Sequence, residues 1–279
     1  MCIWSYAVQR VNSVKKRGDI TVKVVILAGG KGTRISEESQ YRPKPMVEIG
    51  GMPILWHIMK GYSYFGFNEF IICAGYKQEY IKDWFANYYR HTSDVTFDFS
   101  QTGKVTYHLV KTEPWKVTVV DTGLNTITGG RVKRIQPYIG NERFMLTYGD
   151  GVCDVNIREL LAFHDANKKT ATLTSVTQMQ DKGVLDITED GTVKSFREKQ
   201  VNDTASINAG FMVLEPEVFQ LLDSDDTVLE KRPLEELATR GELMSYRHYG
   251  FWQCMDTLRE REMLNRMWET GNAPWKVWE

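Results

Sequence analysis

The sequence predicts an α/β fold in which a mostly parallel mixed sheet is flanked by helices, with an antiparallel portion added later in the chain. Three observations predict it. Apolar runs of strand length alternate with longer amphipathic stretches, the first strand feeds directly into a glycine turn, and 279 residues can bury a large core without disulfides. The net charge of -1 argues against broad electrostatic attraction to nucleic acid or to an anionic membrane.

The first part of the chain alternates strand and helix. The β-branched run at 22–27 predicts a buried strand, and Pro53 opens an apolar pattern that predicts a helix at 53–65. A second buried strand is expected at 68–75 and a second helix at 76–89. This order is typical of parallel sheets, whose strands are joined by crossover helices.

Residues 92–140 are less regular and predict an inserted excursion. Short strands are expected around 95–99 and 104–110, followed by a turn-rich stretch at 121–134. The α/β alternation then resumes with a core strand, a helix and another strand at 144–152, 155–169 and 170–176.

The C-terminal part predicts antiparallel structure. Residues 184–199 resemble a hairpin that turns at an Asp-Gly pair, and a further strand is expected at 206–215. A polar amphipathic helix is expected at 256–271, and a tryptophan-rich tail follows it.

Whole-chain features favour a cytoplasmic protein. No apolar run approaches the ~20 residues that cross a bilayer, and the four cysteines show no spacing typical of a zinc or redox site. Residues 1–21 lack the apolar stretch of a signal peptide and are expected to be a mobile extension. Residues 22–279 are expected to form one domain, with a subdivision near residue 180.

The loop from Leu27 to Arg34 follows the first strand and predicts a phosphate cradle. Its glycines at 29, 30 and 32 let backbone N–H groups face a phosphate without side-chain obstruction. A Walker A loop does not fit because Lys31 precedes Gly32 instead of a Ser or Thr, and the dinucleotide fingerprint fails at Ile35. The alternative is a tight structural turn.

Cations and carboxylates accompany this loop. Prolines at 43 and 45 fix the backbone around Lys44, so its ammonium is preorganised to stabilise phosphate charge, although an ordinary surface lysine is the alternative. Asp150 ends an apolar strand, where its carboxylate can reach the crevice at the sheet edge and suits magnesium. Asp256 precedes a predicted helix and could instead cap it.

The motifs Gly-Gly-x-Gly-Thr-Arg and Pro-Lys-Pro together resemble the signature of the sugar-nucleotide pyrophosphorylases, which are nucleotidyltransferases with a Rossmann-like α/β fold. The similarity continues through PKPMVEIGG, TYGDGV and MDTLRE to APWK, over nearly the whole chain after residue 21. Within that family the chain closely resembles the bacterial cytidylyltransferases that make CDP-glucose.

The resemblance implies a magnesium-dependent enzyme that joins CTP to a sugar 1-phosphate, expected to be glucose 1-phosphate, and releases pyrophosphate. It also implies a homo-oligomer, with a hexamer as the expected form, and an antiparallel portion that binds the sugar. No nucleic acid or membrane partner is expected.

The resemblance also assigns roles by position. The nucleotide would be bound by Leu27, Ala28, Gly29, Gly30, Lys31, Gly32, Thr33, Arg34, Lys44, Thr126, Arg131 and Gly149. The sugar phosphate would be bound by Gly183, Glu198, Lys199 and Asn208, and magnesium by Asp150 and Asp256. Catalysis would depend on Lys44, Arg34 and Asp150. Without the resemblance, Arg131 could equally be an ordinary loop arginine.

Three positions, Asp181, Gln200 and Ala209, depart from the family pattern on the sugar side. Gln200 replaces a proline, and Ala209 stands where many relatives have glycine. The alternative is therefore the same chemistry with another sugar 1-phosphate, or with UTP or dTTP. A catalytically silent nucleotide-binding subunit is disfavoured, because the lysine and both aspartates are present.

Overall fold

The computed structural model of the chain describes residues 22–32, 40–101, 103–108, 113–179, 184–187, 193–197 and 204–279. The expected extension at 1–21 lies outside these residues. So do seven single positions singled out in the sequence, namely Thr33, Arg34, Asp181, Gly183, Glu198, Lys199 and Gln200. Among the described residues, every helix is too short or too polar to span a bilayer.

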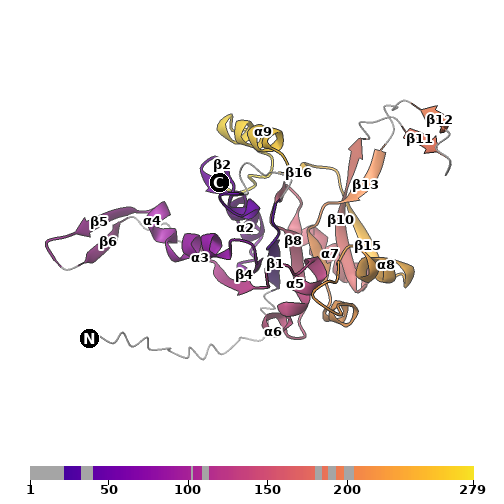
Figure 1. The fold of residues 1–279 in the computed structure, drawn as a ribbon, viewed down its shortest axis with the longest axis horizontal. Helices are drawn as coiled ribbons and strands as arrows, with labels where there is room; N and C mark the ends of the chain where they lie inside the picture. The colour runs from indigo at the N-terminus through magenta and orange to yellow at the C-terminus, as the bar shows by residue number, and fades with distance from the viewer. Residues whose placement is uncertain are drawn as a thin grey trace.

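The core of the molecule is an eight-stranded mixed sheet (Figure 1). Its parallel half contains β1 (Lys23–Ala28), β4 (Glu69–Ala74), β7 (Lys116–Asp121) and β8 (Phe144–Tyr148). Its other half contains β10 (Ala171–Met179), β13 (Thr204–Asn208), β14 (Met212–Leu214) and β15 (Leu243–His248). Strand β14 pairs antiparallel with both β8 and β10, and so joins the halves. The predicted fold class is confirmed.

Apolar clusters cover both faces of the sheet. Val24 and Ile26 of β1 pack in the cluster that includes helix α2 (Ile54–Tyr64). Val25, which points to the opposite face, packs with residues of α5 (Thr128–Arg134) and α8 (Arg232–Thr239). Because both faces of this strand are covered, residues 24–28 of β1 form a continuous apolar run in the sequence.

The order of the strands opens a crevice at one edge of the sheet. Strand β1 lies between β4 and β8, so the chain leaves it first toward one side and later returns on the other. At such a switch point the loops after neighbouring parallel strands diverge, and ligands bind in the space between them. The glycine loop after β1 and the acidic turn after β8 both lie at this edge.

The stretch 92–140 is only partly the expected excursion. The two short strands form a projecting hairpin, β5 (Asp94–Asp98) and β6 (Lys104–His108), as expected (Figure 1). However, β7 pairs with β4 and belongs to the main sheet.

The turn expected at 121–134 was wrong in its second half, which is helix α5. Its two glycines are poor helix formers, but a Cβ on Gly130 would lie 2.4 Å from the carbonyl oxygen of Asp225. The amides of Gly129 and Gly130 both donate to the carbonyl of Thr227. Close packing and these hydrogen bonds outweigh intrinsic propensity.

Two expected elements are each divided. The helix at 76–89 is interrupted at Asn87 into α3 (Gln78–Ala86) and α4 (Tyr88–Thr92). The strand at 206–215 becomes β13 and β14 because Gly210 and Phe211 have positive φ angles. The hairpin at 184–199 is confirmed as β11 (Val184–Ile187) and β12 (Val193–Arg197).

The remaining helices are α6 (Gln136–Ile139), α7 (Ile157–Asn167) and α9 (Leu258–Glu269). The short elements are β2 (Glu48–Ile49), β3 (Met52–Pro53), β9 (Gly151–Cys153), β16 (Trp252–Cys254), and the 3-10 turns η2 (Lys44–Met46) and η3 (Pro216–Leu221).

The tryptophan-rich tail packs against α2 around a buried histidine. Trp268 and Trp275 contact His57 edge-on. Trp275 Nε1 donates to His57 Nδ1 over 3.3 Å, and His57 Nε2 lies 2.8 Å from the carbonyl oxygen of Ile49. Burial lowers the pKa of His57 to about 4, so the ring is neutral and its second nitrogen donates to that carbonyl. The tail is therefore part of the core.

Candidate active site

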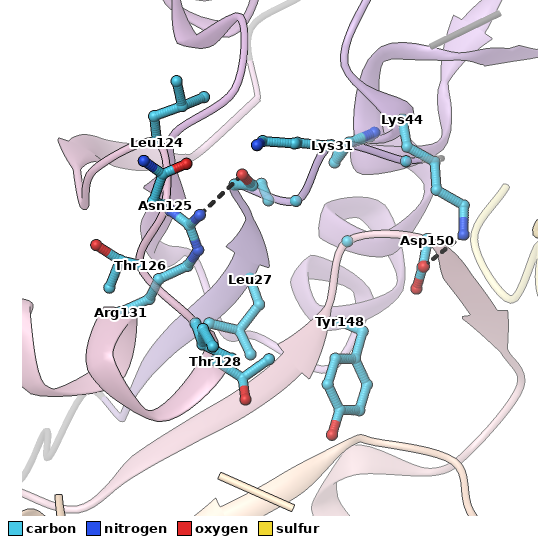
Figure 2. Close-up of a pocket in the computed structure, with 17 residues that line it drawn as sticks. Leu27, Lys31, Lys44, Leu124, Asn125, Thr126, Thr128, Arg131, Tyr148 and Asp150 are labelled. Atoms are coloured by element: carbon cyan, nitrogen blue, oxygen red, sulfur yellow. Dashed lines mark hydrogen bonds and ion pairs between the residues drawn. The ribbon is translucent and has the colours of Figure 1, made fainter. Parts of the chain in front are cut away.

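A cavity of about 580 Å³ lies at the carboxyl edge of the parallel strands (Figure 2). Three loops line it, at residues 27–32 after β1, 124–128 after β7 and 148–150 after β8. Lys44 and Pro45 of η2 and Arg131 of α5 complete the lining. Its volume is typical of pockets that hold a small molecule.

The glycine loop is closely packed on one side and open on the other. A Cβ on Gly29 would lie 2.1 Å from Arg131 Nη1, so only glycine fits there. Gly32 has a φ of 63°, which also favours glycine. A Cβ on Gly30, by contrast, would meet nothing within 4 Å. The loop can therefore expose its backbone to a ligand at Gly30, while Gly29 packs against Arg131.

Arg131 fixes the glycine loop. Its side chain is buried, and Nη2 donates to the carbonyl of Gly29 over 2.9 Å (Figure 2). Nη1 donates to Thr122 Oγ1 and to the carbonyl of Gly123, each at 2.7 Å. Burial lowers the pKa of this guanidinium, and both of its terminal nitrogens donate hydrogen bonds to oxygen atoms. Arg131 thus joins the loops after β1 and β7, and direct contact with a nucleotide stays a prediction.

Lys44 lies between two carboxylates. Its Nζ is 2.7 Å from Asp150 Oδ2 and 2.5 Å from Asp256 Oδ1, although the three residues are far apart in sequence. Pairing of β9 with β16 brings the aspartates together, and the amide of Met255 donates to the carbonyl of Asp150. Figure 2 shows Lys44 and Asp150 facing one another at the rim of the cavity.

Asp256 does not cap the helix that follows it. Thr257 accepts from the amide of Glu260, and the Glu260 side chain accepts from the amide of Thr257, which is a complete capping box. The carboxylate of Asp256 is therefore available to Lys44, and the alternative of a helix-capping role is wrong.

The charges of this cluster favour binding of a further cation. Burial alone would lower the pKa of Lys44, but the two carboxylates outweigh it and raise that pKa, so the ammonium is charged. One ammonium between two carboxylates leaves a net charge of about -1 for the group. Two converging carboxylates provide the hard oxygen ligands that suit a divalent ion, with ligand phosphates completing its coordination. The residues therefore fit the metal site expected from the sequence.

A second cavity of about 650 Å³ adjoins the first and shares Tyr148 and Asp150 with it. Asn208 lines this second cavity, as does Asp256. The lysine–aspartate cluster thus lies where the two cavities meet, so two ligands bound side by side would have their adjoining groups next to the same charges.

The structure brings together most of the described residues that the sequence singled out. The first cavity is lined by Leu27, Ala28, Gly29, Gly30, Lys31, Gly32, Lys44, Thr126, Arg131, Gly149 and Asp150. Sequence reasoning missed Pro45, Leu124, Asn125, Ile127, Thr128 and Tyr148 in this cavity, and Glu230 and Trp252 in the second. The end of β7 would have indicated the 124–128 loop, had that strand been placed in the main sheet.

Comparison with known proteins agrees with this geometry. The family described as "Nucleotidyl transferase" matches residues 23–252. The chain belongs to the nucleotidyl transferase family. It is 54% identical to a glucose-1-phosphate cytidylyltransferase of Salmonella typhi over 92% of this chain and all of that protein. A protein of Bacillus subtilis named as a probable glucose-1-phosphate cytidylyltransferase is 47% identical, again over 92% of this chain and all of the relative.

Solved structures share the nucleotidyl transferase fold. A UDP-glucose pyrophosphorylase bound to UDP-glucose superposes with a TM-score of 0.64 at 15% identity, covering 90% of this chain and all of that one. HddC from Yersinia pseudotuberculosis, complexed with GMP-PN, gives 0.63 at 24% identity, covering 88% and 99%. At these identities the likeness establishes the fold alone.

Proposed function

We propose that this chain transfers a cytidylyl group from CTP to glucose 1-phosphate, forming CDP-glucose and pyrophosphate. The observation that carries the proposal is the cluster of Lys44, Asp150 and Asp256 at the junction of two cavities. One cavity has a glycine loop suited to a triphosphate, and the other adjoins it at the charges. The names of the 54% and 47% identical relatives support CTP and glucose 1-phosphate as the substrates.

The reaction needs no protein nucleophile. A phosphate oxygen of the sugar phosphate attacks the α-phosphorus of CTP, and the bond to pyrophosphate breaks in line with it. Backbone N–H groups of the loop at 27–32 orient the triphosphate, and Lys44 stabilises charge on the α-phosphate. We assign Thr33 and Arg34 to the same loop function, and Arg34 together with Lys44 would offset charge on the α-phosphate and the leaving pyrophosphate.

We propose Mg²⁺ as the divalent ion held by Asp150 and Asp256. Bound there, it would supply positive charge that offsets the charge of the substrate phosphates. The two carboxylates would hold the ion, and Lys44 would contact the substrate phosphates. Titration calorimetry of the nucleotide-free protein with MgCl₂ tests the site without any turnover.

We assign sugar binding to the part of the chain beyond about residue 180. Asn208 lines the second cavity, which supports the assignment. Gly183, Glu198 and Lys199 belong to the same proposal by resemblance. The nucleotide half would then be residues 22–179, and CTP as substrate favours a cytoplasmic location.

We further propose a homo-oligomer, with a hexamer as the expected form. The β5–β6 hairpin projects from the body and exposes Phe97 (50%), Phe99 (92%) and Tyr107 (36%) (Figure 1). An isolated two-stranded hairpin is marginally stable in water, which favours packing against another copy. Light scattering that gave only monomer at working concentrations would contradict this proposal.

The activity is tested with a panel of nucleoside triphosphates and sugar 1-phosphates, scored by pyrophosphate release from the purified chain. We expect CTP with glucose 1-phosphate to give the highest kcat/KM. A clear preference for UTP, dTTP or another sugar phosphate would contradict the assignment while preserving the chemistry, and it would agree with the departures at Asp181, Gln200 and Ala209.

A further inference from the structure

Glu230 is a carboxylate at the wall between the two cavities that neither the motif nor the cluster around Lys44 accounts for. It lies just before α8 and lines the 650 Å³ cavity. Its side chain contacts two hydroxyls, Tyr148 Oη at 2.6 Å and Thr128 Oγ1 at 2.7 Å. Among the described residues it has no salt bridge. A partly buried carboxylate with only neutral partners is a strong acceptor for further hydroxyl groups.

The hydrogen bonds around Glu230 all run in one direction. Asn208 Nδ2 donates to Tyr148 Oη at 3.5 Å, and Tyr148 Oη donates its single proton to Glu230 Oε1. On the other side, the amide of Leu229 donates to Thr128 Oγ1, which donates to Glu230 Oε2. Each carboxylate oxygen has two lone pairs, and each accepts one of these protons. No other donor among the described residues reaches Glu230, so one lone pair on each oxygen is left for a ligand.

The network also fixes a wall shared by both cavities. Tyr148 lines both cavities. Its ring packs against Gly210, where an added Cβ would lie only 2.9 Å from Tyr148 Cδ2. Thr128 lines the nucleotide cavity alone. Burial, followed by the charge of Glu230, raises the pKa of Tyr148, so this phenol keeps its proton and acts as the donor to the carboxylate.

We propose that Glu230, positioned by Tyr148 and Thr128, binds hydroxyl groups of the sugar ring in the second cavity and so selects the sugar. This inference rests on the proposed function and adds a specificity-determining residue to it. An uncharged polyhydroxylated ring supplies hydroxyl donors for the remaining lone pairs of the carboxylate. Tyr148 acts through Glu230 as a positioning residue. Asp150 and Asp256, which belong to the charged cluster proposed to serve the phosphates, line the same cavity.

The test is a Glu230→Gln variant assayed against glucose 1-phosphate and its series of monodeoxy analogues. We expect KM for glucose 1-phosphate to rise about 10-fold to 100-fold, which is the usual contribution of a hydrogen bond to a charged group, while KM for CTP changes less than about 2-fold. For the wild type, removal of one particular hydroxyl should raise KM by a similar factor. For the variant, removal of that hydroxyl should cost almost nothing, because its partner is already lost.

Two further variants keep the test decisive. Tyr148→Phe keeps the carboxylate of Glu230 but removes the hydrogen bond that positions it. We expect a smaller rise in KM for the sugar phosphate than with Glu230→Gln, again without a change in KM for CTP. Glu217→Gln, which alters an exposed glutamate outside both cavities, is the matched control. Thermal unfolding confirms that each variant is folded.

The outcomes separate this inference from the proposed function. Two results with an active wild type would show that Glu230 does not bind the sugar hydroxyls. In one, Glu230→Gln raises KM by the same factor for glucose 1-phosphate and for every deoxy analogue. In the other, it raises KM for CTP as much as KM for the sugar phosphate. A wild type that releases no pyrophosphate with any pair of substrates would overturn the proposed function and this inference together.

Discussion

Replacement of Lys44 by methionine removes the ammonium that joins Asp150 and Asp256. Its two contacts, at 2.7 and 2.5 Å, are charge-assisted hydrogen bonds, each worth about 1.5–3 kcal/mol in proteins. The aspartate side chains are 29% and 19% exposed, so solvent screening favours the lower end of that range, or about 3 kcal/mol for the pair. If Lys44 makes comparable bonds to phosphate oxygens in the transition state, its loss corresponds to about a 100-fold fall in kcat.

The assay is steady-state pyrophosphate release with saturating CTP and glucose 1-phosphate. Lys60→Met is the control, because Lys60 also forms a partly buried ion pair, with Glu113 at 3.0 Å, but lines neither cavity. We expect that control to stay within about 2-fold of wild type. A Lys44→Met enzyme that kept more than about a tenth of its kcat would refute the reasoning.

Three further predictions concern the glycine loop, His57 and Asp256. Gly29→Ala should lower the free energy of unfolding, measured by urea titration, by about 1–3 kcal/mol because the added methyl group overpacks against Arg131. The control Gly30→Ala should stay within about 0.5 kcal/mol of wild type. Equal effects of the two changes would contradict the packing described. The pKa of His57 is lowered to about 4 in the folded protein, so its contribution to the free energy of unfolding is fully present above pH 6.5 and is lost as pH falls toward 4, by up to about 3 kcal/mol. In a His57→Gln variant, the free energy of unfolding should lack this part of its pH dependence. Identical pH profiles for the variant and the wild type would contradict this role of His57. Asp256→Asn should raise the Kd for Mg²⁺ at least about 10-fold in calorimetry, and an unchanged Kd would place the metal elsewhere.

The parallel half of the fold could be predicted because its strands are local signals. The strand at 22–27 and the helix opened by Pro53 each combine a periodic apolar pattern with a glycine or proline boundary. Strand β7 was missed as part of the sheet because only Val120 of its six residues is buried, so it lacks the continuous apolar run of a central strand. Helix α5 was missed because its two glycines, which normally disfavour a helix, are required here by close contact with Thr227 and Asp225. These residues lie far along the chain, so the local sequence pattern does not indicate the contact.

The site was predictable in part for the same reason. The glycine loop and Lys44 stand in motifs whose chemistry can be read locally, and Asp150 ends a strand. That Asp256 meets Lys44 instead of capping α9 depends on the pairing of β9 with β16 and on Thr257 as the cap. Glu230 carries no motif, and only the folded chain brings it to Tyr148 and Thr128.

The central claim is that the two cavities hold a nucleoside triphosphate and a sugar phosphate, and that these react directly with one another. CTP labelled at its α-phosphorus, incubated with glucose 1-phosphate, Mg²⁺ and the purified chain, tests it most directly. We predict that the label appears in CDP-glucose with one pyrophosphate released for each molecule formed. Label that stayed in CTP, or appeared only in CMP or CDP, would contradict the account.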